Sequence, residues 1–355
     1  MRLGMPHCGN LYIPVKAIAN RLGIDIVIPP PTSQRTLSLG VKYSPEMACL
    51  PFKLTLGNMI EALELGADTT MIPGGPGPCR FGYYHKVDEA ILHKLGYKFY
   101  MATQELGLVR LIKLLTNGAS LGKIVTASRF GLAKLKALDE LERMVPKIRA
   151  VEREKGNATR IYRQGIKAID NAADYRALNQ AKREHLQKLM NLPTVSSPDP
   201  LKIGITGEFF VVLDPFANMD IEIELGKLGV EVRRSIFVQD WVKFNPFIYV
   251  FGLREKDKSH KAARPYLSRH VGGDGWQSVG EKVLHNRDWD GLVHLEPFGC
   301  LPEITARNIM PSTKEKLPVL NIIYDEHTGK AGMVNRLEAF VDMIKRKRRE
   351  VKVCV

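Results

Sequence analysis

Short apolar runs alternate with stretches of helical periodicity in the first third of the chain. The apolar runs predict strands, and the periodic stretches predict amphipathic helices. The predicted strands are 25–29, 69–73 and 98–102, and the predicted helices are 53–65 and 87–95. Alternation of this kind is typical of a parallel sheet covered by helices, so residues 1–118 are expected to form an N-terminal α/β lobe.

The segment 119–197 has almost no strand pattern and is expected to be a helical insertion followed by a linker. Its apolar side chains recur at helical spacing, at Leu132, Leu135, Leu138, Leu141, Val145 and Ile148. Pro146 is expected to kink or restart this helix, and Asn157 is expected to cap the next one. The sequence PTVSSPDP at 193–200 is typical of a linker.

Alternation of strands and helices returns in the region 198–355. The predicted strands are 201–206, 231–237, 291–296 and 319–324, and the predicted helices are 218–228, 278–286, 303–309 and 333–345. No residue-level repeat relates this region to the first one. We therefore predict an α/β protein with two lobes built on parallel sheets and joined by a mainly helical middle segment.

Composition places the chain among ordinary globular proteins. It has 355 residues, of which 45% are hydrophobic and 25% are charged. No run of about 18 apolar residues occurs, so no membrane span is expected. Polar residues and prolines interrupt residues 1–20, which argues against a secretory signal, and the expected location is cytoplasmic.

The formal net charge of +14 is concentrated in two stretches. Residues 123–188 contain 16 Lys or Arg and 8 Asp or Glu, and residues 345–352 contain six basic residues and one acidic residue. These stretches could bind nucleic acid, an acidic partner or phosphates. The sequence favours a solvated basic face without a specific nucleic-acid partner, because no aromatic-rich or groove-reading motif accompanies the charge.

Three of the five widely spaced cysteines lie at points where an α/β sheet places its ligands. Cys49 precedes a predicted helix, and Cys79 and Cys300 follow the carboxyl ends of predicted strands. A helix N-terminus favours the thiolate, which binds soft metals and iron–sulfur clusters. Each cysteine alone could equally be a small buried hydrophobic residue, and no C-x-x-C pair is present.

The remaining cysteines carry weaker signals. Cys8, beside His7, could be a fourth ligand, a reactive thiol or a packing residue, and packing is favoured. Cys354 lies next to the basic tail, where a ligand would be hard to hold in place.

Two loops could contribute to a site without cysteine. The sequence GEFFVVLDPFAN at 207–218 could present Glu208 and Asn218 to a substrate as candidate catalytic residues. The glycine-rich sequence VGGDGWQSVG at 271–280 opens a predicted helix and could hold an anion, although such loops are more often plain turns. No P-loop, H-E-x-x-H or G-x-S-x-G motif is present.

Several of these segments together resemble one known family. The matching pieces are ACLPFKLTLGN, GPCRFGYY, TGEFFVVLDPFAN, GGDGWQSVG, HLEPFGCLPE and YDEHTGKAGMVNRLEAFVDM, in this order along nearly the whole chain. They resemble the 2-hydroxyacyl-CoA dehydratase superfamily, and within it the proteins described as related to CoA-substrate-specific enzyme activases. The most specific pieces are the one around Cys300 and the last one.

The resemblance implies two flavodoxin- or Rossmann-like lobes with a 4Fe-4S cluster held by Cys49, Cys79 and Cys300. It also implies an ATP-hydrolysing activase as partner, which donates a low-potential electron for the loss of a hydroxyl group from an acyl-CoA. A homo- or hetero-oligomer is expected. The alternatives are an electron-transfer or cluster-holding accessory protein without substrate chemistry, and a structural zinc or thiol protein that uses the same cysteines.

Overall fold

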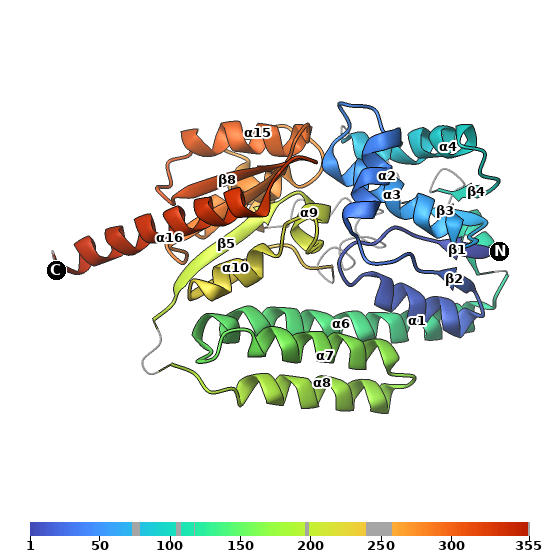
Figure 1. Cartoon of the computed structure of the whole chain (residues 1–355), viewed down its shortest axis with the longest axis horizontal. Helices are drawn as coiled ribbons and strands as arrows, with labels where there is room; N and C mark the ends of the chain where they lie inside the picture. The colour runs from blue at the N-terminus through green and yellow to red at the C-terminus, as the bar shows by residue number, and fades with distance from the viewer. Residues whose placement is uncertain (73–78, 104–107, 117, 196–198, 239–257, 354–355) are drawn as a thin grey trace. The chain divides into compact units, whose positions relative to one another are not determined.

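The computed structural model describes residues 1–72, 79–103, 108–116, 118–195, 199–238 and 258–353 (Figure 1). The chain divides into two compact units: unit 1 is Met1–Lys136 with Ala173–Tyr175, and unit 2 is Ala137–Ala172 with Arg176–Val355. Within the described residues each unit contains one four-stranded parallel sheet, which confirms the predicted α/β fold class. The helical segment 119–197 is shared between the two units.

The sheet of unit 1 has the strand order β2-β1-β3-β4. Its strands are short, namely β1 (Arg2–Gly4), β2 (Asp25–Val27), β3 (Thr69–Met71) and β4 (Tyr100–Ala102). The helices of this unit are α1 (Tyr12–Leu22), α2 (Gln34–Tyr43), α3 (Leu50–Glu64), α4 (Tyr84–Lys94), α5 (Leu108–Leu115) and the first half of α6 (Leu121–Val151). A 3₁₀ turn, η1 (Arg80–Tyr83), precedes α4.

Helix α3 is buried along almost its whole length and supplies much of the core of unit 1. It approaches α2 so closely that a Cβ on Gly40 would lie 1.7 Å from the carbonyl oxygen of Lys53, and one on Gly57 would lie 2.0 Å from that of Thr36. The Thr36 hydroxyl donates a 2.8 Å hydrogen bond to buried Glu61 across the same contact. The two glycines therefore permit direct contact between the helix backbones.

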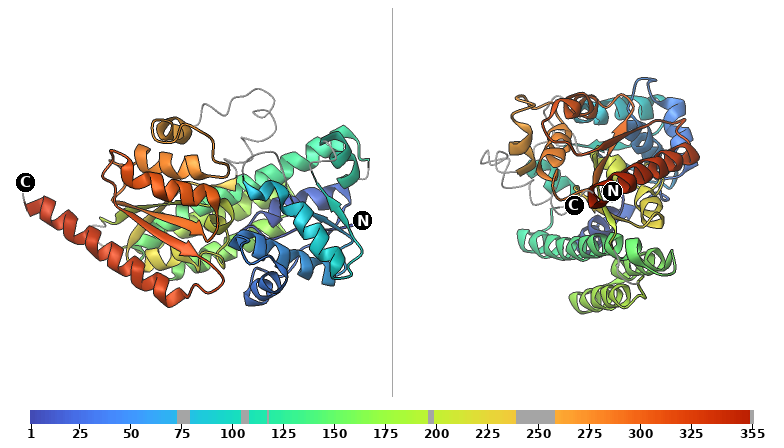
Figure 2. Two further views of the ribbon diagram at one scale, coloured as in Figure 1. Left: turned by 90° about the horizontal axis from the view of Figure 1, so that it is seen from above. Right: turned by 90° about the vertical axis from the view of Figure 1, so that its left-hand side faces the viewer.

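The sheet of unit 2 has the corresponding order β6-β5-β7-β8. Its strands are β5 (Leu201–Gly207), β6 (Val230–Arg234), β7 (Gly291–Pro297) and β8 (Val319–Tyr324). The helices that follow β5 are α9 (Phe209–Leu213), α10 (Ile221–Lys227), α13 (Lys258–Ala263), α14 (Gly275–Leu284), α15 (Leu301–Ile309) and α16 (Lys330–Val353), with the 3₁₀ turn η4 (Met310–Ser312) after α15. Figure 2 shows α16 on one face of this sheet and α15 on the other.

Helices α13 and α14 repeat the packing of α2 and α3. A Cβ on Gly280 would lie 1.9 Å from the carbonyl oxygen of Ser259, and the Ser259 hydroxyl donates a 2.6 Å hydrogen bond to Glu281. Each unit thus contains a helix pair in which a glycine allows backbone contact and a buried hydroxyl bonds a glutamate.

Helices α6, α7 (Asn157–Asn171) and α8 (Tyr175–Met190) form a layer (Figure 1). The first half of α6 belongs to unit 1, and its second half belongs to unit 2. Helix α6 continues through Pro146, so the expected restart does not occur, and Asn157 is the first residue of α7 rather than its cap. The cap is Gly156, at a positive φ of 102°, and the Glu152 carboxylate accepts hydrogen bonds from the backbone N–H groups of Gly156 and Ala158 at 2.9 and 2.7 Å. A carboxylate from the preceding turn therefore performs the capping that the sequence assigned to Asn157.

No helix in the described part of the chain combines the length and apolar character that crossing a membrane requires.

Candidate thiol and carboxylate sites at helix N-termini

The three predicted ligand cysteines share one local environment. Cys49, Cys79 and Cys300 are the N-cap residues of α3, η1 and α15, and all three have extended backbone conformations. None of them forms a disulfide. A helix N-terminus carries a partial positive charge, which favours the anionic form of a nearby thiol.

The first and third of these helices also begin with the same residues. Both sequences read Cys-Leu-Pro, at 49–51 and at 300–302, with proline in the first turn of the helix. Proline suits this position because its fixed φ is helical and the first-turn N–H has no intrahelical partner. The two units thus share a three-residue signature that was too short to stand out as a repeat in the sequence.

In unit 1, the loops that carry Cys49 and Cys79 are linked. Cys49 is 7% exposed, and its Sγ forms a hydrogen bond with the hydroxyl of Tyr84, the first residue of α4. The guanidinium of Arg80, directly after Cys79, donates a 2.9 Å hydrogen bond to the carbonyl oxygen of Met47. A positive charge therefore lies next to one cysteine in sequence and holds the loop that leads to the other.

In unit 2, Cys300 lies three residues beyond β7 and is 7% exposed. Gly299 has a positive φ of 75°, and the Cys300 N–H donates a 2.9 Å hydrogen bond to the carbonyl oxygen of Pro297. This tight turn places the thiol at the carboxyl edge of the sheet, as the sequence predicted. Parallel α/β sheets bind their ligands at this edge.

Three carboxylates gather at helix N-termini on the same edge of unit 2. Glu208 is the N-cap of α9, Asp274 is the N-cap of α14, and Glu303 lies in the first turn of α15. The Glu208 carboxylate accepts a 2.9 Å hydrogen bond from the N–H of Val211, and that of Asp274 accepts one of 3.1 Å from the N–H of Phe209. The positive helix ends partly offset the concentration of negative charge.

A buried polar network surrounds the third of these carboxylates. Glu303 Oε2 accepts a 2.7 Å hydrogen bond from the Ser278 hydroxyl and lies 2.8 Å from Nε2 of His294. Nδ1 of His294 lies 3.0 Å from the side-chain oxygen of Asn321. Both ring nitrogens of His294 therefore face side-chain oxygens, which fixes the orientation of the ring within this network.

The electrostatics of this edge favour protonated carboxyl groups. Burial raises the pKa of Glu208 to about 7, and the Glu303 charge adds to the effect. Burial also raises the pKa of Asp274 well above its usual value, with further contributions from Glu303 and Glu208. Groups with pKa values near or above neutrality can donate protons under physiological conditions.

The remaining candidates from the sequence are Asn218, Cys8 and Cys354. The side-chain N–H₂ group of Asn218 donates to the carbonyl oxygens of Val211 and Val212 at 2.9 and 3.2 Å, and its oxygen accepts from the N–H of Ile221 at 3.3 Å. Such contacts fit a structural role in holding the loop. Cys8 is buried in unit 1, and Cys354 lies outside the described residues.

The sequence reasoning identified Glu208 but missed Asp274, Glu303 and His294. One signal was available, because aspartate is a preferred N-cap residue and Asp274 lies in the loop that leads into a predicted helix. The glycine-rich loop 271–280 was given as a possible anion site, with a plain turn as the more common case; at the start of α14 the protein supplies its own carboxylate. The glycines provide the turn, since Gly272 and Gly273 have positive φ values of 87° and 44°.

Within the described residues, no group of three or more His, Cys, Asp or Glu side chains is arranged to hold a metal ion. The donor chemistry nevertheless suits a cluster, because thiols are the donors that iron–sulfur clusters use, and all three of these cysteines cap a helix N-terminus. Two of them belong to unit 1 and one belongs to unit 2.

Comparison with known proteins adds no assignment: the chain matches no protein-family model, and no curated protein sequence is similar to it.

Proposed function

We propose that the protein is an iron–sulfur protein that works as 2-hydroxyacyl-CoA dehydratase subunits do. Cys49, Cys79 and Cys300 would hold the cluster, most simply a 4Fe-4S cluster. The observation that carries this proposal is the shared position of the three cysteines, each of which is the N-cap residue of a helix.

When bound, the cluster would supply one-electron chemistry at low potential. An ATP-hydrolysing activase would deliver the electron, since the sequence contains no P-loop. The setting would be anaerobic metabolism in the cytoplasm, in a homo- or hetero-oligomer, with no specific nucleic acid and no membrane as partners.

The carboxyl groups of unit 2 fit the second requirement of such a reaction. When a hydroxyl group leaves an acyl-CoA as water, its oxygen must receive one proton, while the neighbouring carbon loses one. Glu208, with a pKa raised to about 7, is suited to hold that proton and donate it to the departing oxygen. Asp274, whose pKa is also raised by burial, would hold a further proton beside it.

The direct test is the metal and sulfide content of the protein after anaerobic purification. We expect iron and acid-labile sulfide in equal amounts. Zinc without sulfide would replace the proposal with a structural thiol site. Iron and sulfide whose spectrum does not respond to any acyl-CoA would support an electron-transfer or cluster-holding accessory protein instead.

A further inference from the structure

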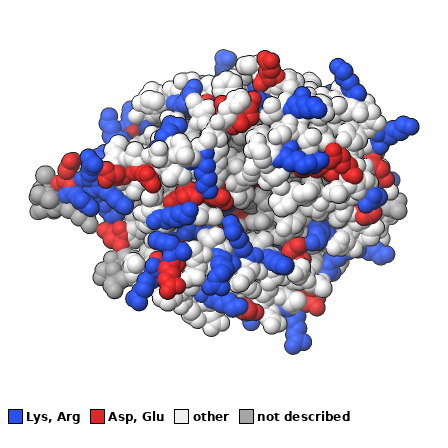
Figure 3. Space-filling model, in the orientation of Figure 1, with Lys and Arg blue, Asp and Glu red and all other residues white. Residues whose placement is uncertain are grey.

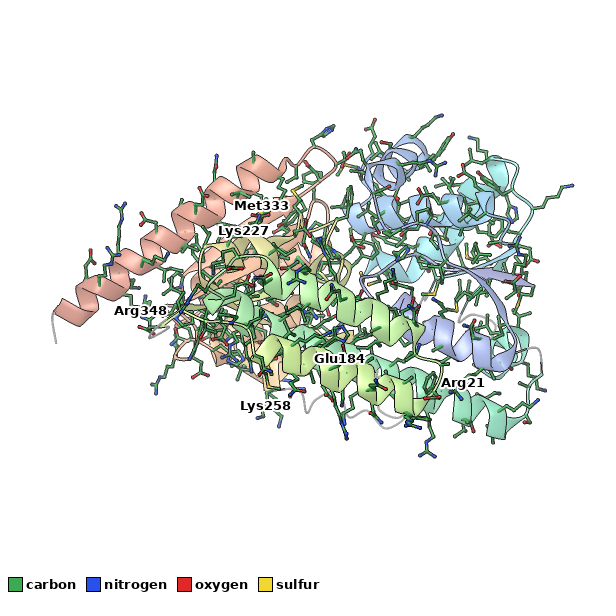
Figure 4. The ribbon with its side chains drawn as sticks, turned by 60° about the horizontal axis from the view of Figure 1, so that its bottom comes forward. Arg21, Glu184, Lys227, Lys258, Met333 and Arg348 are labelled. Atoms are coloured by element: carbon green, nitrogen blue, oxygen red, sulfur yellow. The ribbon has the colours of Figure 1, made fainter. Side chains whose placement is uncertain are left out.

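A cavity of about 610 Å³ lies within unit 2, between α7, α10 and the first turn of α16. Its volume falls in the range of about 300–1,000 Å³ that is typical of small-molecule sites. Five basic side chains and two carboxylates line it. Figure 3 shows Lys and Arg side chains gathered over α7 and α10, and Figure 4 shows labelled Lys227 on α10, near α7.

The two carboxylates of the cavity are paired within it. Glu224 lies 3.0 Å from the ammonium groups of both Lys227 and Lys330, and Asp220 lies 3.3 Å from that of Lys330. These hydrogen-bonded pairs lower the pKa of Glu224 against the opposing effect of burial, so this carboxylate is ionised at neutral pH. Two of the five positive charges are therefore balanced, and three are not.

The unbalanced charges form a stripe on α7. Arg160, Arg163 and Lys167 lie on the cavity side of this helix, at intervals of three and four residues. Among the described residues, Arg163 and Lys167 form no ion pair, and Arg160 donates only to the side-chain oxygen of Asn157, at 3.0 Å. Seven residues of helix rise by about 10 Å, so the charges extend further than one phosphate group can reach.

The other lining residues suit an organic group beside the anion. Ile223 and the aliphatic stems of the long basic side chains offer apolar surface, and the amide of Gln164 can both donate and accept hydrogen bonds. Arginine is well suited to bind phosphate through two parallel hydrogen bonds, and lysine adds a point charge.

We propose that this cavity binds a nucleoside diphosphate group, with the phosphates along Arg160, Arg163 and Lys167 and the nucleoside against Ile223. The ligand could be a free nucleotide or the nucleotide part of a larger molecule such as coenzyme A. The site lies entirely in unit 2 and does not depend on an iron–sulfur cluster.

The test is calorimetric titration of the full chain with ADP, coenzyme A and inorganic phosphate, each at low ionic strength. We expect ADP or coenzyme A to bind with an affinity that falls as salt is added, and inorganic phosphate to bind much more weakly. Replacement of Arg163→Ala with Lys167→Ala should weaken binding at least about tenfold. Binding of coenzyme A without ADP would identify the larger ligand, and binding of ADP would identify the free nucleotide as sufficient.

A matched control removes the same two charges from α8. Arg183 and Lys188 are exposed, and neither lines the cavity; Figure 4 labels Glu184, the ion-pair partner of Lys188, on that helix. The variant Arg183→Ala with Lys188→Ala should bind within about twofold of the parent. The proposal is overturned if neither ADP nor coenzyme A binds, or if the α7 and α8 variants lose affinity equally.

Discussion

Unit 1 and unit 2 use the same strand order but differ in the residues that begin their helices. In each unit, the strand that comes first along the chain (β1 or β5) lies between the strands that come second and third. Cys79 and Cys300 occupy corresponding positions, since each follows the third strand of its unit. The helix before that strand begins at Cys49 in unit 1 and at Asp274 in unit 2.

The two units therefore have the same helix N-termini at the edge of the sheet, but the residue type at the N-cap differs and determines which chemistry is available there. A helix N-terminus at the carboxyl edge of a parallel sheet stabilises any anion. Unit 1 has thiols at both positions. Unit 2 has one thiol and one carboxylic acid, so it combines a soft ligand with a group that can carry a proton.

The largest effect is expected when a thiol is removed. We expect the variant Cys300→Ser to lose most of the iron that the proposed cluster would bind. We expect the same of Cys49→Asp, which gives this position of unit 1 the residue type found in unit 2. Hydroxyl and carboxylate oxygens are poor substitutes for thiolate in such clusters. Iron and sulfide analysis of anaerobically purified protein is the measurement, with Cys354→Ser as the control that keeps its iron. Equal iron in the parent and in Cys300→Ser would remove Cys300 from the ligand set.

The second effect tests whether the helix pairs of the two units are equivalent. Gly57→Ala and Gly280→Ala should each reduce the free energy of unfolding by about 3 kcal/mol, because the added Cβ would overlap a backbone carbonyl of the neighbouring helix. Urea denaturation followed by circular dichroism measures this loss. Gly332→Ala is the control: it lies in α16 with open space around it, so it should be neutral or slightly stabilising. A large loss in only one unit would show that the two contacts differ.

A third prediction concerns a carboxyl group of unit 1. Asp88 in α4 is fully buried, neither of its oxygens has a hydrogen-bond partner among the described residues, and burial raises its pKa well above the usual value. The group favours the folded state below the pKa of the unfolded chain, and this contribution is lost as pH rises toward the folded pKa. Asp88→Asn should therefore raise the free energy of unfolding by about 2 kcal/mol at pH 8 and leave it nearly unchanged at pH 4.

Thermal unfolding at the two pH values gives the comparison. Glu89→Gln is the matched control, since it removes a charge from an exposed neighbouring position of the same helix. The interpretation fails if the two variants show the same dependence on pH.

The smallest effect is expected at Glu208, in unit 2. Its pKa of about 7 lies above the usual 4.5, so its contribution to stability is present below about pH 4.5 and is lost as pH approaches 7. Glu208→Gln should flatten this part of the stability curve, by less than the full value of about 1.4 kcal/mol per pKa unit because Glu208 is only partly buried. Asp325 offers a control of opposite sign, because hydrogen bonds from Thr328 and His327 lower its pKa against the effect of burial. Asp325→Asn should destabilise at pH 7 and have little effect at low pH.

The sequence predicted the strands whose apolar runs were long enough to recognise. The four strands of unit 2 have five to seven residues and were all found near their observed positions. Strand β1, Arg2–Gly4, was not predicted because it contains no apolar run, whereas the other three-residue strands of unit 1 lie within predicted runs. Helix α2 was also missed, because much of its sequence, QRTLSLGVKY, is polar and contains a glycine that only the contact with α3 explains.

The residues of the candidate site, like the strands, could be predicted only where a local sequence pattern marked them. The three cysteines and Glu208 stood out because each follows or precedes a recognisable element. His294 could not be found in this way, since it lies inside an apolar strand, and its partners Glu303 and Asn321 come from other elements. Pairings between distant segments depend on the order of strands in the sheet, which no local pattern contains.

The division of α6 between the units has a consequence for synthesis on the ribosome. Glu142, in the second half of α6, forms an ion pair with buried Arg234 of β6, which lies 92 residues later in the chain. At translation rates of about 5–20 residues per second, Arg234 is synthesised roughly 5–20 s after Glu142. During that interval the buried residues of this half of α6 lack neighbours that are made later; Leu141, for example, lies beside Gly165 of α7. The part of α6 that belongs to unit 2 therefore stays incompletely packed until later parts of the chain have been synthesised.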